Sequence, residues 1–170
     1  MPQTAIAGPL GEDNARFASG DGYTIYLAAG IALPILTDGD EGIDHATRTL
    51  DAVMASYLLS EGIKTFTEER RPDGSDHRSF PSTHATVAFA LATAESEWHP
   101  KQAPLWYLGA AIIADSRLEL NSHRLGDVLV GAALGYCTTK WALSRPHGII
   151  LTPFIEPDSG CVGIQVTATF

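Results

Sequence analysis

The stretch SRLELNSHRLGD, residues 116–127, is the most informative part of this sequence for the fold. An expected helix at about residues 105–117 ends inside it, a short polar turn follows, and a last helix begins that ends near Leu143. His123 and Asp127 are four residues apart, so on one helix they would lie on the same face. The carboxylate could then hold one imidazole nitrogen and leave the other free to react.

Two earlier segments supply cationic side chains that suit an oxyanion. Lys64 lies near the end of a long expected helix, residues 43–70, whose apolar residues recur at helical spacing. Arg71 follows after six residues, just before Pro72 starts a loop. Together with Arg117, these side chains could converge on one phosphate, because the arginine fork suits two oxygens and lysine acts as a point charge.

The segment Pro81-Ser82-Thr83-His84 opens the next expected helix, with Ser82 as its N-cap. Backbone N–H groups in a first helical turn have no partner in the helix and can bind an anion. His84 is a second titratable group, suited to protonating a leaving oxygen.

Each piece has an ordinary structural explanation when taken alone. A lysine and an arginine usually form a solvated surface, a serine at a helix start is usually only a cap, and a His–Asp pair is often only a contact. Their joint occurrence, in this order along helix, loop and helix starts, favours phosphate chemistry.

In these three segments the chain resembles the type 2 phosphatidic acid phosphatase and vanadium haloperoxidase superfamily. The first segment, from Lys64 to Pro72, and the third, from Ser116 to Asp127, match the family pattern in residues and spacing. The second departs once, because the family usually has glycine where this chain has Thr83. Threonine keeps the backbone N–H that is thought to contact phosphate.

The resemblance implies a role for each matching residue. His123 would attack phosphorus and become phosphohistidine, Asp127 would orient it, and His84 would protonate the leaving group. The phosphoryl oxygens would be bound by the side chains of Lys64, Arg71, Ser82 and Arg117 and by the N–H of Thr83. No metal or other cofactor is implied, and vanadate would act as an inhibitor.

The resemblance also implies the substrate and the compartment. We expect a phosphatase for phosphomonoesters or diphosphates, of lipid or isoprenoid type, in the periplasm or cell envelope, with peripheral membrane contact and self-association left open. No signal peptide is visible, because no basic region is followed by an apolar run. Two alternatives remain: a haloperoxidase in which the same residues hold vanadate as cofactor, and a non-catalytic phosphate-binding module.

The composition indicates a globular chain. Its 170 residues are 45% hydrophobic and 18% charged, which is typical of one folded domain rather than a disordered chain. We expect a single domain over residues 1–170. The net charge of −9 disfavours nucleic acid as a partner, although a local basic pocket can still bind an anionic substrate.

The predicted fold is an all-α bundle of about five or six helices, at about residues 21–145, with a C-terminal β-hairpin at about residues 148–170. The apolar run 22–36 is shorter than the roughly 20 residues of a membrane span, so it predicts a buried core helix. The last arm, residues 162–170, alternates apolar and polar side chains as a strand does.

Several residues outside the motifs also carry an expectation. Recurring Gly126, Gly131 and Gly135 indicate close helix packing in the last helix. Cys137 and Cys161 fit no metal-site spacing and are interpreted as small buried thiols, with a disulfide left open. Surface positions are expected for the histidines outside the motifs: His45, His99 and His147.

Overall fold

The computed structural model describes residues 11–145, 148, 150–156 and 161–166. Its helices are α1 (Glu12–Ser19), α2 (Asp21–Thr37), α3 (Gly42–Thr67), α4 (Thr83–Trp98), α5 (Ala103–Glu119) and α6 (Leu125–Leu143). Two short 3-10 turns, η1 (Gly39–Glu41) and η2 (Pro100–Gln102), follow α2 and α4. The prediction of a mostly helical bundle is confirmed.

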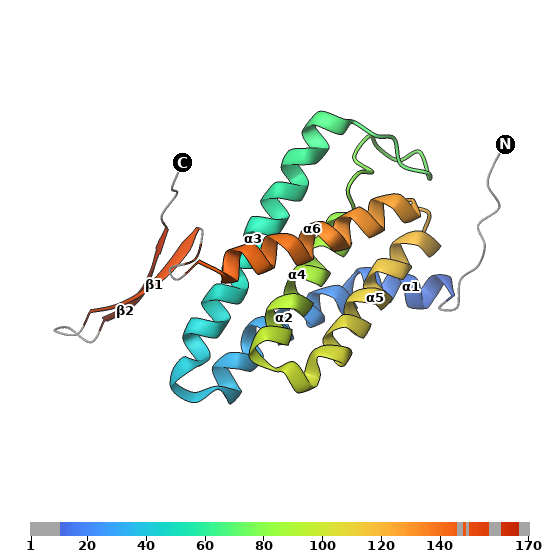
Figure 1. Ribbon diagram of the computed structural model, residues 1–170. Coiled ribbons are helices and arrows are strands. Elements are labelled where there is room, and N and C mark those ends of the chain that lie inside the picture. The colour runs from blue at the N-terminus through green and yellow to red at the C-terminus, as the bar shows by residue number, and fades with distance from the viewer. Residues whose placement is uncertain (1–10, 146–147, 149, 157–160, 167–170) are drawn as a thin grey trace.

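The central element of the bundle is α4, around which α2, α3, α5 and α6 pack (Figure 1). Its residues 85–95 are buried with the exception of Phe89, and most of them are alanine or threonine. Small side chains let the surrounding helices approach α4 closely. The largest apolar cluster forms where Leu91 and Val87 of α4 meet Val53 of α3 and Trp106 of α5.

Close packing of α6 on α4 depends on two of the three recurring glycines. A β-carbon at Gly135 would lie 2.0 Å from the carbonyl oxygen of Thr86, and one at Gly131 would lie 2.7 Å from that of Ser82. At Gly126 a β-carbon would meet nothing within 4 Å. The packing prediction is therefore confirmed for Gly131 and Gly135 but not for Gly126.

The apolar run 22–36 forms α2 as predicted, but the prediction that this helix is buried is wrong. Only Gly30 and Pro34 are buried, whereas Ile25 is 61% exposed and Leu36 is 81% exposed. One face of α2 packs against the core cluster, and the other face carries no covering element among the described residues. None of the helices in these ranges combines the length and hydrophobicity that crossing a bilayer requires.

After α6 the chain turns back toward α3, where the N–H of Ile150 donates to a carboxylate oxygen of Asp51 at 2.7 Å. Strands β1 (Leu151–Glu156) and β2 (Cys161–Val166) follow and pair antiparallel, with Leu151 opposite Val166. The turn at 157–160 and residues 167–170 lie outside the described residues. The complete β-hairpin therefore stays a prediction.

Two expectations for single residues are wrong. Cys137 on α6 is exposed rather than buried. His45 and His99 are not surface side chains. Both bond the same carboxylate, with Asp38 Oδ2 2.6 Å from His45 Nδ1 and Asp38 Oδ1 2.9 Å from His99 Nε2. This network ties the end of α2 to α3 and α4. His147 lies outside the described residues.

Candidate active site

The three motifs meet at one end of the bundle, where α3 and α5 end and α4 and α6 begin (Figure 1). Backbone hydrogen bonds hold these helix ends together. The N–H of Ser82 donates to the carbonyl of Asp127 at 3.0 Å, and the N–H of His123 donates to the carbonyl of Arg117 at 3.3 Å. The loop after α3 joins them, because the N–H of Asp73 donates to the carbonyl of Asn121 at 3.1 Å.

His123 is buried, with 4% of its surface exposed, and it precedes α6 rather than lying on it. Its Nδ1 lies 2.7 Å from the backbone carbonyl oxygen of Ser79. A carbonyl can only accept, so Nδ1 carries the proton and Nε2 keeps a lone pair. Nε2 is therefore left with a free lone pair, and the hydrogen-bond partner of Nδ1 is a carbonyl rather than a carboxylate.

Asp127 occupies a different position from the one that the helical spacing predicts. Its Oδ2 is 3.8 Å from His123 Nδ1, too far for a hydrogen bond. The same oxygen accepts from the hydroxyl of Ser79 at 2.6 Å and from the N–H of Arg124 at 2.9 Å. The expectation of a direct Asp127–His123 hydrogen bond is wrong because His123 lies before the helix, where the same-face rule does not apply.

Ser79 was missed by the sequence reasoning, although it contacts both members of the pair. Its carbonyl positions His123 and its hydroxyl donates to Asp127, and the residue itself is fully buried. A carbonyl contact leaves no mark in the sequence, since every residue type has a backbone oxygen. No spacing pattern could have found it.

Lys64, Arg71 and Arg117 are brought together around His123. Burial and the nearby Arg71 lower the pKa of Arg117, whose buried Nε has no hydrogen-bond partner. Burial also lowers the pKa of Lys64, opposed by the carboxylate of Glu61 at 3.5 Å. Arg71 donates from Nε to Asp76 at 2.7 Å. The site therefore holds concentrated positive charge that an anion would stabilise.

The start of α4 offers further groups for an oxyanion. Ser82 is fully buried at the N-cap, but its hydroxyl makes no capping bond and has no partner. Thr83 turns its hydroxyl away toward α3, where it donates to Glu61 at 2.8 Å. The first backbone N–H groups of α4 have no intrahelical acceptor. The side chain where the family has glycine is thus bound to Glu61, the carboxylate that also pairs with Lys64.

His84 lies on the side of the site that faces α1 and α2. Its ring is 4.6 Å from the ring of Tyr23, and it forms a hydrogen bond with the backbone of Ser19. Burial and the charge of Arg117 lower the pKa of His84 to about 4. Burial and the charges of Arg71 and Arg117 likewise lower the pKa of His123 to about 4. Both imidazoles are therefore neutral near pH 7.

Three further charged or titratable residues of the loop and of α6 have separate places. Arg78 pairs with Glu61, and Arg124 pairs with Glu69, so both guanidinium groups already have a carboxylate partner. His77 is exposed in the loop. In the ranges that the structure describes, no group of three His, Cys, Asp or Glu side chains could hold a metal ion. The arrangement can bind a tetrahedral oxyanion beside a neutral histidine nitrogen.

Comparisons with known proteins show the family and the fold. The sequence model of the PAP2 superfamily matches residues 46–149. A lipid A 1-phosphatase from Porphyromonas gingivalis is 39% identical over 69 residues, which are 38% of this chain and 16% of that protein. This chain thus spans a small part of that relative's length. The crystal structure of Aquifex aeolicus LpxE has a TM-score of 0.60 at 22% identity, covering 84% of this chain and 100% of that one.

Proposed function

Because the chain belongs to the PAP2 superfamily, we propose that it is a metal-independent phosphatase that hydrolyses the phosphate group of a phosphorylated lipid. One observation carries the proposal. The Ser79 carbonyl holds Nδ1 of the buried His123 and leaves Nε2 as a nucleophile beside Lys64, Arg71 and Arg117. A phosphoryl group placed among these cations would lie within reach of that nitrogen.

In the first step, Nε2 of His123 attacks phosphorus and the bond from phosphorus to the leaving oxygen breaks. The substrate brings a proton as the phosphate monoanion. This proton passes through His84 to the leaving oxygen, so the alcohol leaves neutral and His84 is neutral again. The three cations and the buried hydroxyl of Ser82 stabilise charge on the phosphoryl oxygens, which is the main catalytic demand in phosphoryl transfer. The product is a phosphohistidine on His123.

In the second step, water attacks phosphorus and breaks the bond to Nε2. His84, neutral after the first step, accepts the water proton, and inorganic phosphate leaves. Through both steps the Ser79 carbonyl keeps the Nδ1 proton in place. The positive charge that His123 gains as phosphohistidine is stabilised by Asp127, whose carboxylate lies 3.8 Å from Nδ1.

The lipid character of the substrate is supported by the name of the relative, a lipid A 1-phosphatase. The exposed apolar side chains on α2, α3, α5 and α6 support contact with a membrane surface. A place in the periplasm or cell envelope belongs to the same proposal.

The proposal is tested by phosphate release and by trapping the intermediate. Phosphate release is compared, in EDTA, for para-nitrophenyl phosphate, phosphatidic acid and an isoprenyl diphosphate. We expect the two lipid substrates to give the higher kcat/KM. His123→Ala should lose more than about 1,000-fold in kcat, whereas His77→Ala, an exposed loop histidine, should retain activity. Base quenching followed by mass spectrometry should find phosphate on His123. Turnover that persists in His123→Ala would overturn the mechanism.

A further inference from the structure

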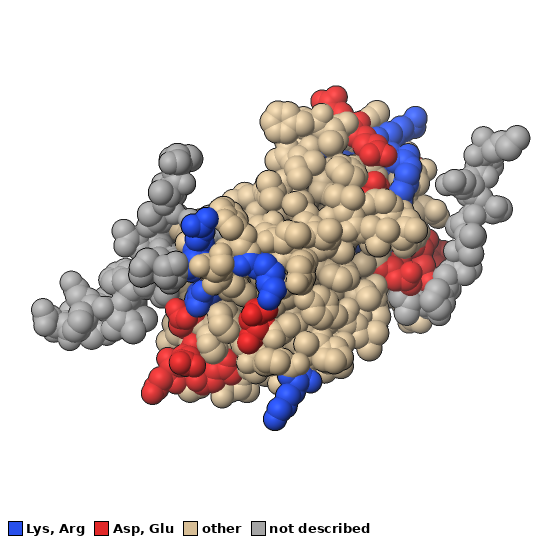
Figure 2. All heavy atoms as spheres, viewed as in Figure 1, with Lys and Arg blue, Asp and Glu red and all other residues tan. Residues whose placement is uncertain are grey.

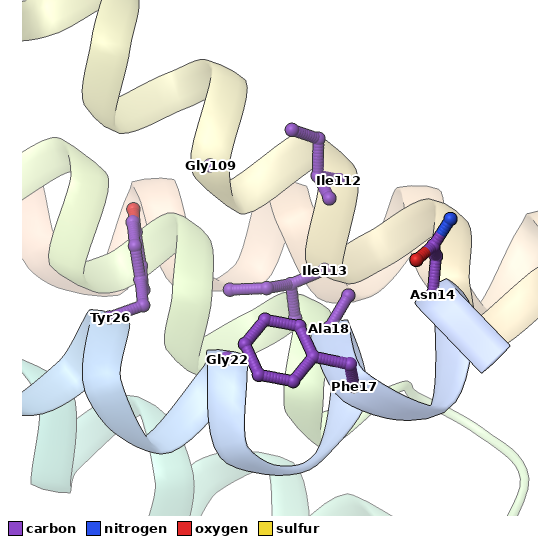
Figure 3. Close-up of a pocket in the computed structure, with 8 residues that line it drawn as sticks. All are labelled: Asn14, Phe17, Ala18, Gly22, Tyr26, Gly109, Ile112 and Ile113. Atoms are coloured by element: carbon purple, nitrogen blue, oxygen red, sulfur yellow. The ribbon is translucent and has the colours of Figure 1, made fainter. Parts of the chain in front are cut away.

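An apolar pocket of about 290 Å³ lies between α1, α2 and α5, outside the phosphate site (Figure 3). Phe17 and Ala18 of α1 lie opposite Ile112 and Ile113 of α5 in this view. The pocket is lined by Asn14, Phe17, Ala18, Gly22, Tyr26, Gly109, Ile112 and Ile113. Its size is at the lower end of the range for small-molecule sites.

The lining suits a hydrocarbon. Tyr26 closes one end of the pocket. Its hydroxyl donates to the backbone carbonyls of Trp106 at 2.8 Å and Ala88 at 3.3 Å, so this polar group already has partners in the core. Gly109 permits this arrangement, because a β-carbon there would lie 2.7 Å from the Tyr26 ring. The remaining surface comes mainly from aliphatic and aromatic carbon. A polar ligand would lose its hydration on entering with little hydrogen bonding in return.

The elbow between α1 and α2 lies between the pocket and the proposed general acid, His84. Ser19 and Tyr23, which contact His84, are the immediate neighbours in sequence of the lining residues Ala18 and Gly22. The elbow between α1 and α2 therefore has His84 on one side and the pocket on the other. The group that protonates a leaving oxygen marks the direction in which the leaving group departs.

A second element leads from the pocket to the phosphate site. Ile113 lines the pocket and Arg117 lies four residues later on α5, which is about one helical turn, or roughly 6 Å along the axis. The pocket is also reachable from outside, since Phe17 is 58% exposed and Ile112 is 39% exposed. A ligand could thus place a charged head at Arg117 and an apolar chain against Ile113.

We propose that this pocket binds the hydrocarbon chain of the leaving group, so that the α1–α2 elbow and α5 select phosphorylated substrates with an apolar tail. The inference rests on the proposed phosphatase function for the placement of the head group. It assigns to α1, which lies outside the matched family region, a role in substrate selection.

Binding of alkylphosphonates tests the pocket without any turnover. Their carbon–phosphorus bond has no leaving oxygen, so ethyl-, butyl- and octylphosphonate can be titrated by calorimetry below their micelle concentrations. For the wild type we expect the Kd to fall about threefold per methylene, or roughly 50- to 100-fold from butyl to octyl, as apolar surface is buried. A Kd that does not change with chain length would overturn the proposal.

Two variants on α5 supply the matched comparison. Ile112→Trp enlarges a side chain that lines the pocket, whereas Leu105→Trp makes the same change at a position that is 70% exposed and does not line it. Ile112→Trp should weaken octylphosphonate at least 10-fold and leave ethylphosphonate within twofold, and Leu105→Trp should change neither. Equal octylphosphonate binding by wild type and Ile112→Trp would overturn the proposal.

Failure of the pocket and failure of the phosphatase proposal give different results. If the chain hydrolyses no phosphate ester but binds phosphonates with the expected length dependence, the tail site stands and the catalytic proposal fails. If hydrolysis of para-nitrophenyl phosphate is normal but neither binding nor kcat/KM depends on chain length, the tail site fails alone. Thermal melting of both tryptophan variants establishes that each is folded.

Discussion

Ser79 connects the two residues that the sequence pairs directly. In the structure the imidazole of His123 donates to a backbone carbonyl, and the carboxylate of Asp127 holds the hydroxyl of the same serine. A backbone carbonyl does not titrate and its position is fixed by the chain, so it sets the tautomer whenever the imidazole is neutral. The carboxylate then contributes electrostatically and through the position of Ser79.

This arrangement predicts a mild effect for Asp127→Asn. The tautomer of His123 is set by the Ser79 carbonyl, so the amide should not reverse it. The loss of the negative charge 3.8 Å from Nδ1 should lower kcat about 10- to 100-fold. Steady-state kinetics on para-nitrophenyl phosphate would measure it. A loss as large as that in His123→Ala would mean that Asp127 controls the tautomer after all.

The pKa values predict an acidic optimum. Burial and neighbouring arginines hold the pKa of both His123 and His84 at about 4. Below that pH, His123 is protonated and cannot attack, so kcat/KM should fall. Above it, His84 is neutral in the empty site, so the proton for the leaving oxygen must arrive on the phosphate monoanion, which is lost above a pKa of about 6.

We therefore expect kcat/KM to peak between about pH 4 and pH 6. A pH profile with a phosphate monoester measures both limbs. The control is a methyl phosphonate ester with an activated leaving group, because it needs no general acid and has no second ionisation. For this substrate kcat/KM should still fall below about pH 4 but should not fall above about pH 6. An acidic limb near pH 6.5 for both substrates would contradict the lowered pKa of His123.

At the scale of helices, the sequence predicted positions better than environments. The segments that became α3, α4, α5 and α6 were recognised from periodicity and from breaks such as Pro72. The environment of α2 was not, because an apolar run does not reveal how many neighbours cover it; Ile25 and Leu36 stayed exposed. Likewise the spacing of His123 and Asp127 predicts a pair on one helix. In the structure α6 begins at Leu125, so Asp127 lies on the helix and His123 lies before it.

Packing of α6 on α4 holds the active site together, and it predicts opposite outcomes for two glycines. Gly135→Ala would place a β-carbon 2.0 Å from the Thr86 carbonyl oxygen, backbone that cannot move without displacing α4. The free energy of unfolding should drop by about 2–4 kcal/mol. Gly126→Ala, on the same helix with open space around it, should change stability by less than about 1 kcal/mol.

Chemical denaturation measures this difference, with the unfolding midpoint of each variant compared with that of the wild type. Gly135→Ala should also lower kcat, because displacement of α4 moves Ser82 and His84 relative to His123. If Gly135→Ala proved as stable as Gly126→Ala, the close approach of the two helices would be wrong.

At the scale of the whole molecule, charge and apolar surface are segregated. Figure 2 shows a broad uncharged region across the middle of this face, with most charged side chains to its left and right and further cationic atoms at the lower edge. Exposed large apolar side chains occur on several helices, including Leu58, Phe66, Leu105, Leu129 and Trp141. These exposed apolar side chains support a lipid surface as a partner of the molecule.

The net charge of −9 decides which lipid surface is expected. Anionic headgroups would repel the chain, so partition into phosphatidylcholine vesicles should exceed partition into phosphatidylglycerol vesicles and should vary little with salt. Sedimentation with vesicles measures both. The opposite lipid preference would show that a basic patch, rather than the uncharged region, contacts the membrane.

Two exposed leucines test whether the apolar surface of α3 and α6 makes the contact. Leu58 on α3 is 53% exposed and Leu129 on α6 is 60% exposed, so replacing both with serine should leave the fold stable. Each leucine would bury roughly half its side chain in lipid, worth about 1 kcal/mol, so the double variant should bind phosphatidylcholine vesicles roughly 10- to 30-fold more weakly. Hydrolysis of para-nitrophenyl phosphate should stay unchanged, because neither leucine touches the phosphate site. Turnover of a lipid substrate in vesicles should fall in proportion to binding, whereas unchanged vesicle binding would place the membrane contact on another face.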